Sequence, residues 1–203
     1  MNWGKKLLDE FLNFCVRLTK EKHISHVVIL TSDTLFLDEI YNNSKLQEAS
    51  KFKLIWHLKY EDVKKWLKAK WFNEEEINLI YEYLWWSATR IKKLLEDYKR
   101  FNTLKEYLEE EAQITANMII FERNKWLTNR EFSLFLEVAK IIVKEWKFVF
   151  DEEDEKKRKE LWKVISKFAE IEILFYDPIG NTVYASSQIY VKAFEILLEK
   201  KQL

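Results

Sequence analysis

The sequence predicts a mainly helical protein with a minor β component, in which a piece of an α/β sheet precedes helices and a C-terminal winged-helix-like module. Three observations lead to this class. Apolar residues recur at helical spacing along most of the 203 residues. A short apolar run at 26–30 is rich in β-branched residues, as buried strands are. Near the C-terminus, two alternating segments flank a link that contains Pro and Gly, which predicts a β-hairpin.

The first expected element is an amphipathic helix over residues 5–21, whose apolar residues repeat at helical spacing. Cys15, the only cysteine, falls on its apolar stripe and is interpreted as a packing residue. A single cysteine excludes an internal disulfide and fits a reducing cytoplasm.

The run at 26–30 is expected to be a strand buried on both faces of a parallel sheet. Polar residues at 31–34 follow it and are candidates for capping a helix at 35–42. A second strand is expected near 52–58. Together these segments make a piece of an α/β sandwich that is too small to close a sheet of its own.

From residue 60 onward the period is helical. Asn73 with Glu76 three residues later is a capping-box signature, and Ser87 is expected to begin the next helix. Later helices are expected at about 103–123 and 129–147.

An acidic run at 151–155 leads directly into a basic run at 156–159, in the order that the helix dipole favours, so a helix is expected to reach about residue 169. Two strands, 171–176 and 182–185, then form the predicted hairpin. A helix at 190–200 closes the chain.

Glycine is scarce and tryptophan is abundant: there are 2 Gly and 9 Trp. Several Trp residues stand where a chain usually turns and where left-handed geometry favours Gly: Trp71, Trp85, Trp86 and Trp126. Two interpretations stay open. These side chains are core aromatics, or glycine has been replaced or recoded at these positions.

The overall charge excludes a global attraction to nucleic acid or membrane, because 34 basic and 34 acidic side chains cancel. The N-terminus lacks the pattern of a signal peptide, and no apolar run approaches the ~20 residues that cross a bilayer. We therefore expect a cytoplasmic protein without a membrane partner. The richness in Lys, Glu, Ile and aromatic residues resembles proteins from hot environments.

Catalytic chemistry finds little support in the sequence. It contains no GxxxxGK[ST] motif, and with Gly4 and Gly180 as the only glycines it has no loop in which backbone N–H groups approach phosphates closely. His23 and His26 flank the start of the expected strand, with no further ligand at metal spacing. We assign no catalytic residue and no metal site.

Two places remain as candidate ligand sites. Ser32 and Asp33 follow the expected parallel strand, where α/β sheets bind ligands, although both residues also suit a helix cap. Arg90 falls in the first turn of the helix after Ser87, where a cation gains nothing from the helix dipole. An incidental surface position explains Arg90 equally.

The winged-helix-like module raises the alternative of DNA binding. Its last helix before the hairpin carries Lys163 and Lys167, and phosphate contacts would come from the basic run Lys156, Lys157, Arg158 and Lys159. The acids at 151–155 oppose this, and the link at 178–181 carries no Lys or Arg. An interaction or oligomerisation module is the preferred use, and strong salt-dependent DNA affinity would favour the alternative.

Residues 8–36 resemble the archaeal ATPase family, which belongs to the AAA/STAND class of P-loop NTPases. The resemblance implies that Thr31, Ser32 and Asp33 occupy the sensor-1 place after a sheet strand. Residues 72–90 resemble the helical lid of the family, with Arg90 at the sensor-2 position. Trp85 and Trp86 replace two glycines there, and Trp71 stands where glycine is usual. Residues 173–178 resemble a strand of the C-terminal winged-helix domain.

The resemblance implies a remnant of the nucleotide-binding α/β domain of a P-loop NTPase at 1–58, a helical lid at 59–112 and a winged-helix-like domain at 113–203. The Walker A and Walker B motifs would lie before the matched part, so we expect a truncated, inactive ATPase. ATP and Mg²⁺ would bind only with the missing nucleotide-binding half. That half or another protein subunit is the expected partner. DNA and a second copy of the chain stay open.

Overall fold

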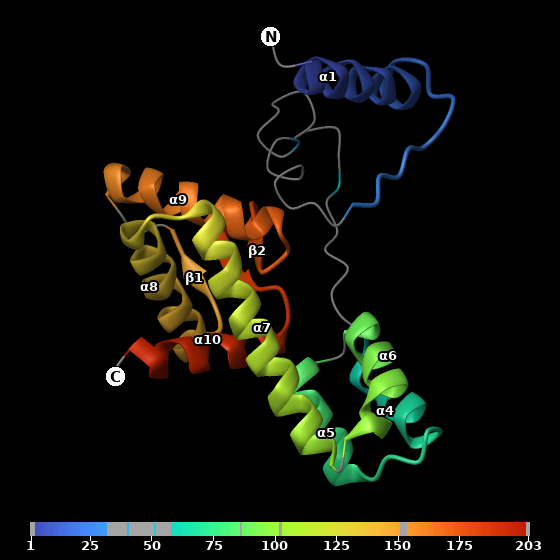
Figure 1. The fold of residues 1–203 in the computed structure, drawn as a ribbon. Coiled ribbons are helices and arrows are strands. Elements are labelled where there is room, and N and C mark those ends of the chain that lie inside the picture. Colours follow the sequence, from blue (N-terminus) through green and yellow to red (C-terminus); the bar gives the residue numbers. More distant parts are fainter. Residues whose placement is uncertain are drawn as a thin grey trace.

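The computed structural model describes residues 3–31, 40, 51, 58–85, 87–101, 103–150 and 154–201. Its α-helices are α1 (Trp3–Val16), α4 (Tyr60–Lys68), α5 (Glu74–Leu84), α6 (Ala88–Asp97), α7 (Leu104–Trp126), α8 (Asn129–Glu145), α9 (Glu155–Glu170) and α10 (Gln188–Lys201) (Figure 1). A π-helical turn at Arg17–Glu21 continues α1, and a 3₁₀ turn at Tyr98–Arg100 follows α6. The strands are β1 (Phe148–Val149), β2 (Leu174–Asp177) and β3 (Thr182–Ala185). This confirms a mainly helical protein with minor β structure.

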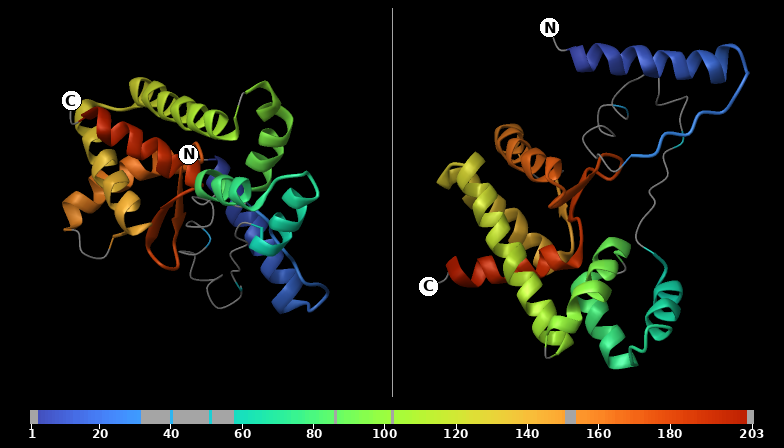
Figure 2. Two further views of the ribbon diagram at one scale, coloured as in Figure 1. Left: turned by 90° about the horizontal axis from the view of Figure 1, so that it is seen from below. Right: turned by 45° about the vertical axis from the view of Figure 1, so that its right-hand side comes forward.

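The N-terminal helix forms as expected, but its apolar stripe is only partly buried. Leu12 packs with Ile40, and Cys15 is also buried. Phe11 and Phe14 are exposed on the same helix. Figures 1 and 2 show α1 apart from the body that the later helices form. The helix therefore has apolar surface that the described residues leave uncovered.

The prediction of a strand at 26–30 is wrong. This segment has no regular secondary structure, and Val28 and Leu30 are 80% and 78% exposed. A buried strand needs hydrogen bonds from neighbouring strands. Within the described ranges, no strand pairs with residues 26–30. The expected helix at 35–42 and strand at 52–58 lie outside the described residues, apart from Ile40 and Leu58. The parallel sheet is thus absent from the part of the chain that the structure describes.

The larger of the two hydrophobic clusters among the described residues extends from Val63 in α4 to Leu197 in α10. Helix α7 runs from the α4–α6 end of this body to the end that holds the sheet (Figures 1 and 2). Helix α10 packs against α5, α7 and α8 and so joins both ends. The expected boundary between residues 112 and 113 falls inside α7, where the helix and the core continue. The division into lid and winged-helix-like domains stays a prediction.

The small sheet is antiparallel throughout, with strand order β1-β3-β2. Val183 of β3 lies between Phe148 and Tyr176 of its two neighbours, and all three are buried. In the turn, Asp177 Oδ1 accepts a hydrogen bond of 3.0 Å from the Ile179 N–H. The predicted hairpin is confirmed, whereas β1 has two residues and no sequence signal announced it. The winged-helix assignment stays a prediction.

Three tryptophans close helices with positive φ angles: 72° at Trp71 after α4, 46° at Trp85 after α5 and 66° at Trp146 after α8. The glycine-like geometry predicted for Trp71 and Trp85 is confirmed, and Trp146 was not predicted. The same prediction is wrong for Trp126, which is the last residue of α7 and precedes an extended Leu127. Trp86 lies outside the described residues. These angles support the interpretation that glycine suits these helix ends.

Candidate functional site

Arg90 joins α6 to α10. Ser87 begins α6 as expected, although its side chain makes no capping hydrogen bond, and Arg90 follows in the first turn. The guanidinium carbon of Arg90 lies 5.2 Å from the ring centroid of Tyr190 in α10, which is a cation–π contact. Burial raises the pKa of Tyr107 in α7, and the charge of Arg90 opposes that rise. The side chain of Arg90 therefore lies where α6, α7 and α10 converge.

Two ion pairs surround this junction. Lys93 of α6 binds Glu111 of α7 with an N–O distance of 2.7 Å. Lys192 of α10 binds Glu82 of α5 at 2.9 Å, and its ammonium also lies 5.3 Å from the ring centroid of Tyr83. The first pair links α6 to α7, and the second links α5 to α10. The junction is held by charge as well as by the shared core.

None of the contacts among the described residues places the other predicted sensor residues near Arg90. Thr31 is exposed at the end of the segment that forms no strand. Ser32 and Asp33 lie outside the described residues. The sensor-1 assignment therefore stays a prediction.

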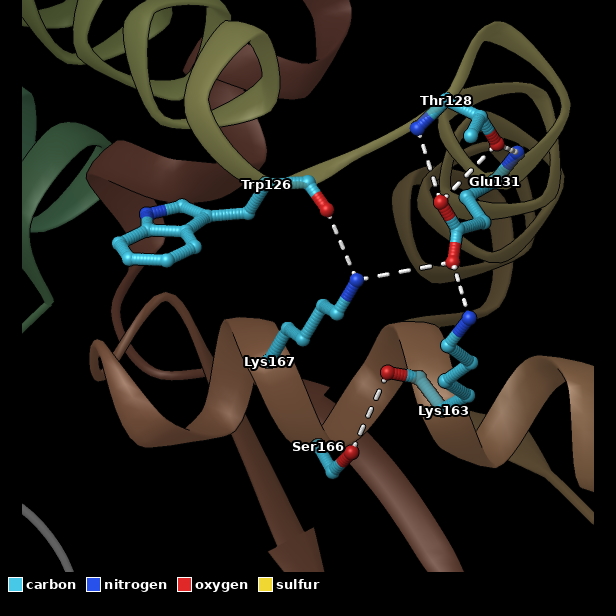
Figure 3. A network of polar contacts seen from close by, with 6 residues as sticks. All are labelled: Trp126, Thr128, Glu131, Lys163, Ser166 and Lys167. Carbon is cyan, nitrogen blue, oxygen red and sulfur yellow. Dashed lines mark hydrogen bonds and ion pairs between the residues drawn. The ribbon is translucent and has the colours of Figure 1, made fainter.

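Lys163 and Lys167, the two lysines proposed for a DNA groove, converge on Glu131 (Figure 3). The Lys163 ammonium lies 2.9 Å and the Lys167 ammonium 3.5 Å from Glu131 Oε1. Lys167 also donates a hydrogen bond of 2.8 Å to the carbonyl oxygen of Trp126 at the end of α7. Both lysines thus tie α9 to the α7–α8 connection.

Three of the four remaining cationic residues of the proposed DNA face also make contacts. Lys159 pairs with Glu155 at 2.7 Å, and the Arg158 guanidinium lies over the Phe150 ring at 5.9 Å. Lys157 also takes part in an interaction. Lys156 is exposed at the start of α9, where its backbone N–H donates to Asp154 Oδ1. DNA contact by these residues stays a prediction, and it would require most of the contacts to be exchanged.

Glu131 is the residue that sequence reasoning missed. Its Oε2 accepts hydrogen bonds of 2.8 Å from the Thr128 N–H and 2.9 Å from the Thr128 hydroxyl. The Glu131 N–H donates in turn to Thr128 Oγ1 at 3.2 Å, and the two backbone N–H bonds form a capping box at the start of α8. The available signal was Thr followed three residues later by Glu before an apolar helix. Its two lysine partners belong to a distant segment, so no local pattern predicted that they would pair with Glu131.

Glu131 is only 14% exposed, and its contacts change its acidity. The hydrogen bonds from the Thr128 backbone and the Lys163 ammonium lower the pKa of Glu131 to about 2, from an ordinary 4.5. A carboxyl with a lowered pKa stabilises the folded state above its unfolded pKa. The contribution of Glu131 is therefore complete above pH 4.5 and is lost as the pH falls towards about 2.

We expect Glu131→Gln to lower the free energy of unfolding by about 1–2 kcal/mol at pH 7, because the amide keeps one cap acceptor and loses both lysines. The difference from the parent protein should shrink between pH 4.5 and about 2, since the parent then protonates Glu131. Urea unfolding at a series of pH values measures this.

Glu155→Gln is the matched control, because Glu155 pairs with Lys159 where both side chains are largely exposed. Its effect should stay within about 0.5 kcal/mol at every pH. A difference between Glu131→Gln and the parent that does not change with pH would contradict the role given to the Glu131 charge.

Within the described ranges, no helix combines the length and apolar character needed to cross a membrane. The same residues bring together no group of three or more His, Cys, Asp or Glu side chains that could hold a metal ion.

Comparison with known proteins relates the chain to archaeal proteins. Residues 1–94 match the model of an ATPase domain found predominantly in Archaea. Two uncharacterized ATP-binding proteins of Methanocaldococcus jannaschii are 36% and 34% identical over 98% and 99% of the chain. An uncharacterized ATP-binding protein of Pyrococcus abyssi is 28% identical over 95% of it. No solved structure matches the chain.

The chain spans 57% of each of the two Methanocaldococcus relatives and 53% of the Pyrococcus one, so about half of their length. The similarity nevertheless covers almost all of the chain, including the body built around α7. The family that residues 8–36 resemble is thus the one whose model matches residues 1–94, and the archaeal relatives named ATP-binding proteins agree with an archaeal ATPase family for this chain.

Proposed function

We propose that the chain is the nucleotide-reporting and interaction part of an ATPase of this family. In this proposal residues 59–112 act as the lid and residues 113–203 as a winged-helix-like module. ATP and Mg²⁺ bind only when a nucleotide-binding half is supplied by a partner or by another segment. The chain then passes the nucleotide state from lid to module.

The observation that carries this proposal is the junction at Arg90. A reporter must contact both the part that senses the ligand and the part that responds. Arg90 lies at the start of α6, the place of a lid sensor, and its guanidinium contacts Tyr190 in the last helix. The Lys192–Glu82 pair adds a second link between the same two parts. A movement of α6 would therefore be transmitted directly to α10 through the Arg90–Tyr190 contact.

ATP enters the proposal through the relatives, which are named ATP-binding proteins. The 203 residues themselves contain no GxxxxGK[ST] motif and only 2 Gly. Phosphate loops hold ATP through closely approaching backbone N–H groups, which need glycine at the tight positions. We infer that the 203-residue chain alone neither grips the phosphates nor hydrolyses ATP.

We expect the purified 203-residue chain to show no ATP turnover with Mg²⁺ and no heat of ATP binding up to about 1 mM, the upper end of common KM values. Phosphate release and calorimetry measure the two quantities. Assays on successive gel-filtration fractions separate the chain from contaminating enzymes.

Arg90→Ala serves as the control variant in the same assays. Turnover that follows the chain through the fractions and falls in Arg90→Ala would overturn the proposal. Release that does not follow the chain comes from a contaminant and agrees with the proposal.

The nucleic-acid alternative is less favoured by the contacts. Lys163 and Lys167 are held by Glu131, and Lys159 by Glu155. A phosphate would have to compete with these carboxylates. The structure therefore favours a protein partner over DNA for this module.

A further inference from the structure

The outward face of α7 carries an apolar stripe. Ile114, Met118 and Phe121 are 51%, 39% and 59% exposed. They are spaced four and three residues apart, so they lie on one face of the helix. The opposite face, with Leu108, Ala112, Ala116 and Ile119, is buried in the core. Figure 2 shows α7 along the outer edge of the body.

Opposite charges stand at the two ends of the stripe. Glu110 lies four residues before Ile114, and Lys125 lies four residues after Phe121, so both extend the same face. Both side chains are exposed. The Lys125 ammonium lies 4.1 Å from the Phe121 ring centroid and 2.9 Å from Glu122 Oε1. The face therefore has a carboxylate at one end, apolar side chains in the middle and the Lys125 ammonium at the other end, where a second copy would have to share it with Glu122.

We propose that this face of α7 binds the same face of a second copy of the chain, with the two helices antiparallel about a two-fold axis. A two-fold contact brings one patch onto itself, so each residue must meet a complementary one. In this register Ile114 faces Phe121 of the second copy, and Asn117 faces Met118. Glu110 then faces Lys125 at both ends of the contact.

The charge pattern selects this occupant and this direction. In a parallel pair, Glu110 of one chain would lie beside Glu110 of the other, and Lys125 beside Lys125. These like charges would repel each other. The antiparallel arrangement converts both contacts into opposite-charge pairs. These pairs surround an apolar centre, and protein interfaces likewise have an apolar core and a polar rim. The proposal does not depend on ATP or on the proposed lid function.

Sedimentation of the 203-residue chain over a range of concentrations tests the pairing. We expect a monomer–dimer equilibrium that Phe121→Glu abolishes, because a carboxylate would be buried against Ile114 of the second copy. Ile179→Glu is the control, since Ile179 is an exposed apolar residue at 58% on the hairpin and lies on another surface. Circular dichroism checks that both variants remain folded.

A charge exchange tests the register. E110K and K125E should each weaken the dimer by about tenfold, because each creates a like-charge contact at both ends. An equimolar mixture of E110K and K125E should associate again, since each end of the mixed dimer then has opposite charges. The double variant E110K/K125E should also recover the dimer.

Three results would overturn the proposal. The first is a chain that stays monomeric at the highest concentrations. The second is a dimer that Phe121→Glu leaves intact or that Ile179→Glu weakens equally, which would assign it to another surface. The third is a mixture of E110K and K125E that remains as weak as each variant alone.

Discussion

Replacing Phe135 by alanine is expected to lower the free energy of unfolding by about 3–5 kcal/mol, the largest effect of any single change considered. Phe135 in α8 is fully buried. Its ring stacks on Phe168 of α9 at 4.0 Å between centroids and meets Phe194 of α10 edge-on at 5.4 Å. Alanine would leave a cavity where three helices meet, because the two neighbouring rings cannot both move into it. Urea or thermal unfolding followed by circular dichroism gives the value.

Phe14→Ala is the matched control for this change. Phe14 is the same residue type in α1, and it is 57% exposed. Its replacement should change the free energy of unfolding by no more than about 0.5 kcal/mol. Equal effects of the two variants would contradict the placement of Phe135 at the centre of the core.

The second large effect should be a gain. We expect the triple variant Trp71→Gly, Trp85→Gly and Trp146→Gly to raise the free energy of unfolding by about 2 kcal/mol. A side chain in the left-handed region costs about 1–2 kcal/mol, and glycine removes that cost. The strain is greatest at Trp85, whose φ of 46° and ψ of −149° fall near a region that glycine alone adopts readily. Chemical unfolding of the triple variant measures the sum.

Two terms reduce this gain, and they differ among the three sites. Trp85 and Trp146 stack at 5.8 Å between centroids, and that contact of about 0.5–1.5 kcal/mol is lost. Glycine also gives the unfolded chain more freedom. Trp71 is 95% exposed and stacks on no ring among the described residues, so Trp71→Gly alone should show the gain most clearly, at about 1 kcal/mol.

Trp126→Gly provides the opposite control. Trp126 is also exposed, but it belongs to the last turn of α7 and its indole N–H donates to Glu122. Glycine should destabilise the protein there by about 1 kcal/mol, since it weakens a helix. If all four tryptophans responded alike, the sign would not follow from the backbone angle, and the explanation by left-handed geometry would fail.

Local signals predicted the elements that local physics determines. The capping box of Asn73 and Glu76 was predicted and is present, with both hydrogen bonds formed. Asp154 caps α9 at the point where the acidic run meets the basic run. The hairpin strands have their expected places because alternation and turn residues act over a few positions. In the two caps the partners lie within three residues, and in the hairpin the pairing begins with Asp177 and Thr182, five residues apart.

Features that depend on distant segments were not predictable. The run at 26–30 has the composition of a buried strand, but a strand exists only when neighbours share its hydrogen bonds. Arg90 was identified as a candidate, whereas its partner Tyr190 belongs to the far end of the chain. The same holds for Glu131, whose lysines come from α9. A sequence pattern reports what a residue prefers, and the fold decides what it meets.

The length of α7 has a mechanical consequence. Its 23 residues form a rod of about 34 Å, since each residue rises 1.5 Å along a helix. Its buried residues, from Leu104 to Ile119, belong to one continuous core, so the helix would tilt as a lever and would not bend as a hinge. A tilt of about 10° at the end beside α6 would carry the end beside α9 through about 6 Å over that length. Small displacements at Arg90 would thus arrive enlarged at the distant sheet.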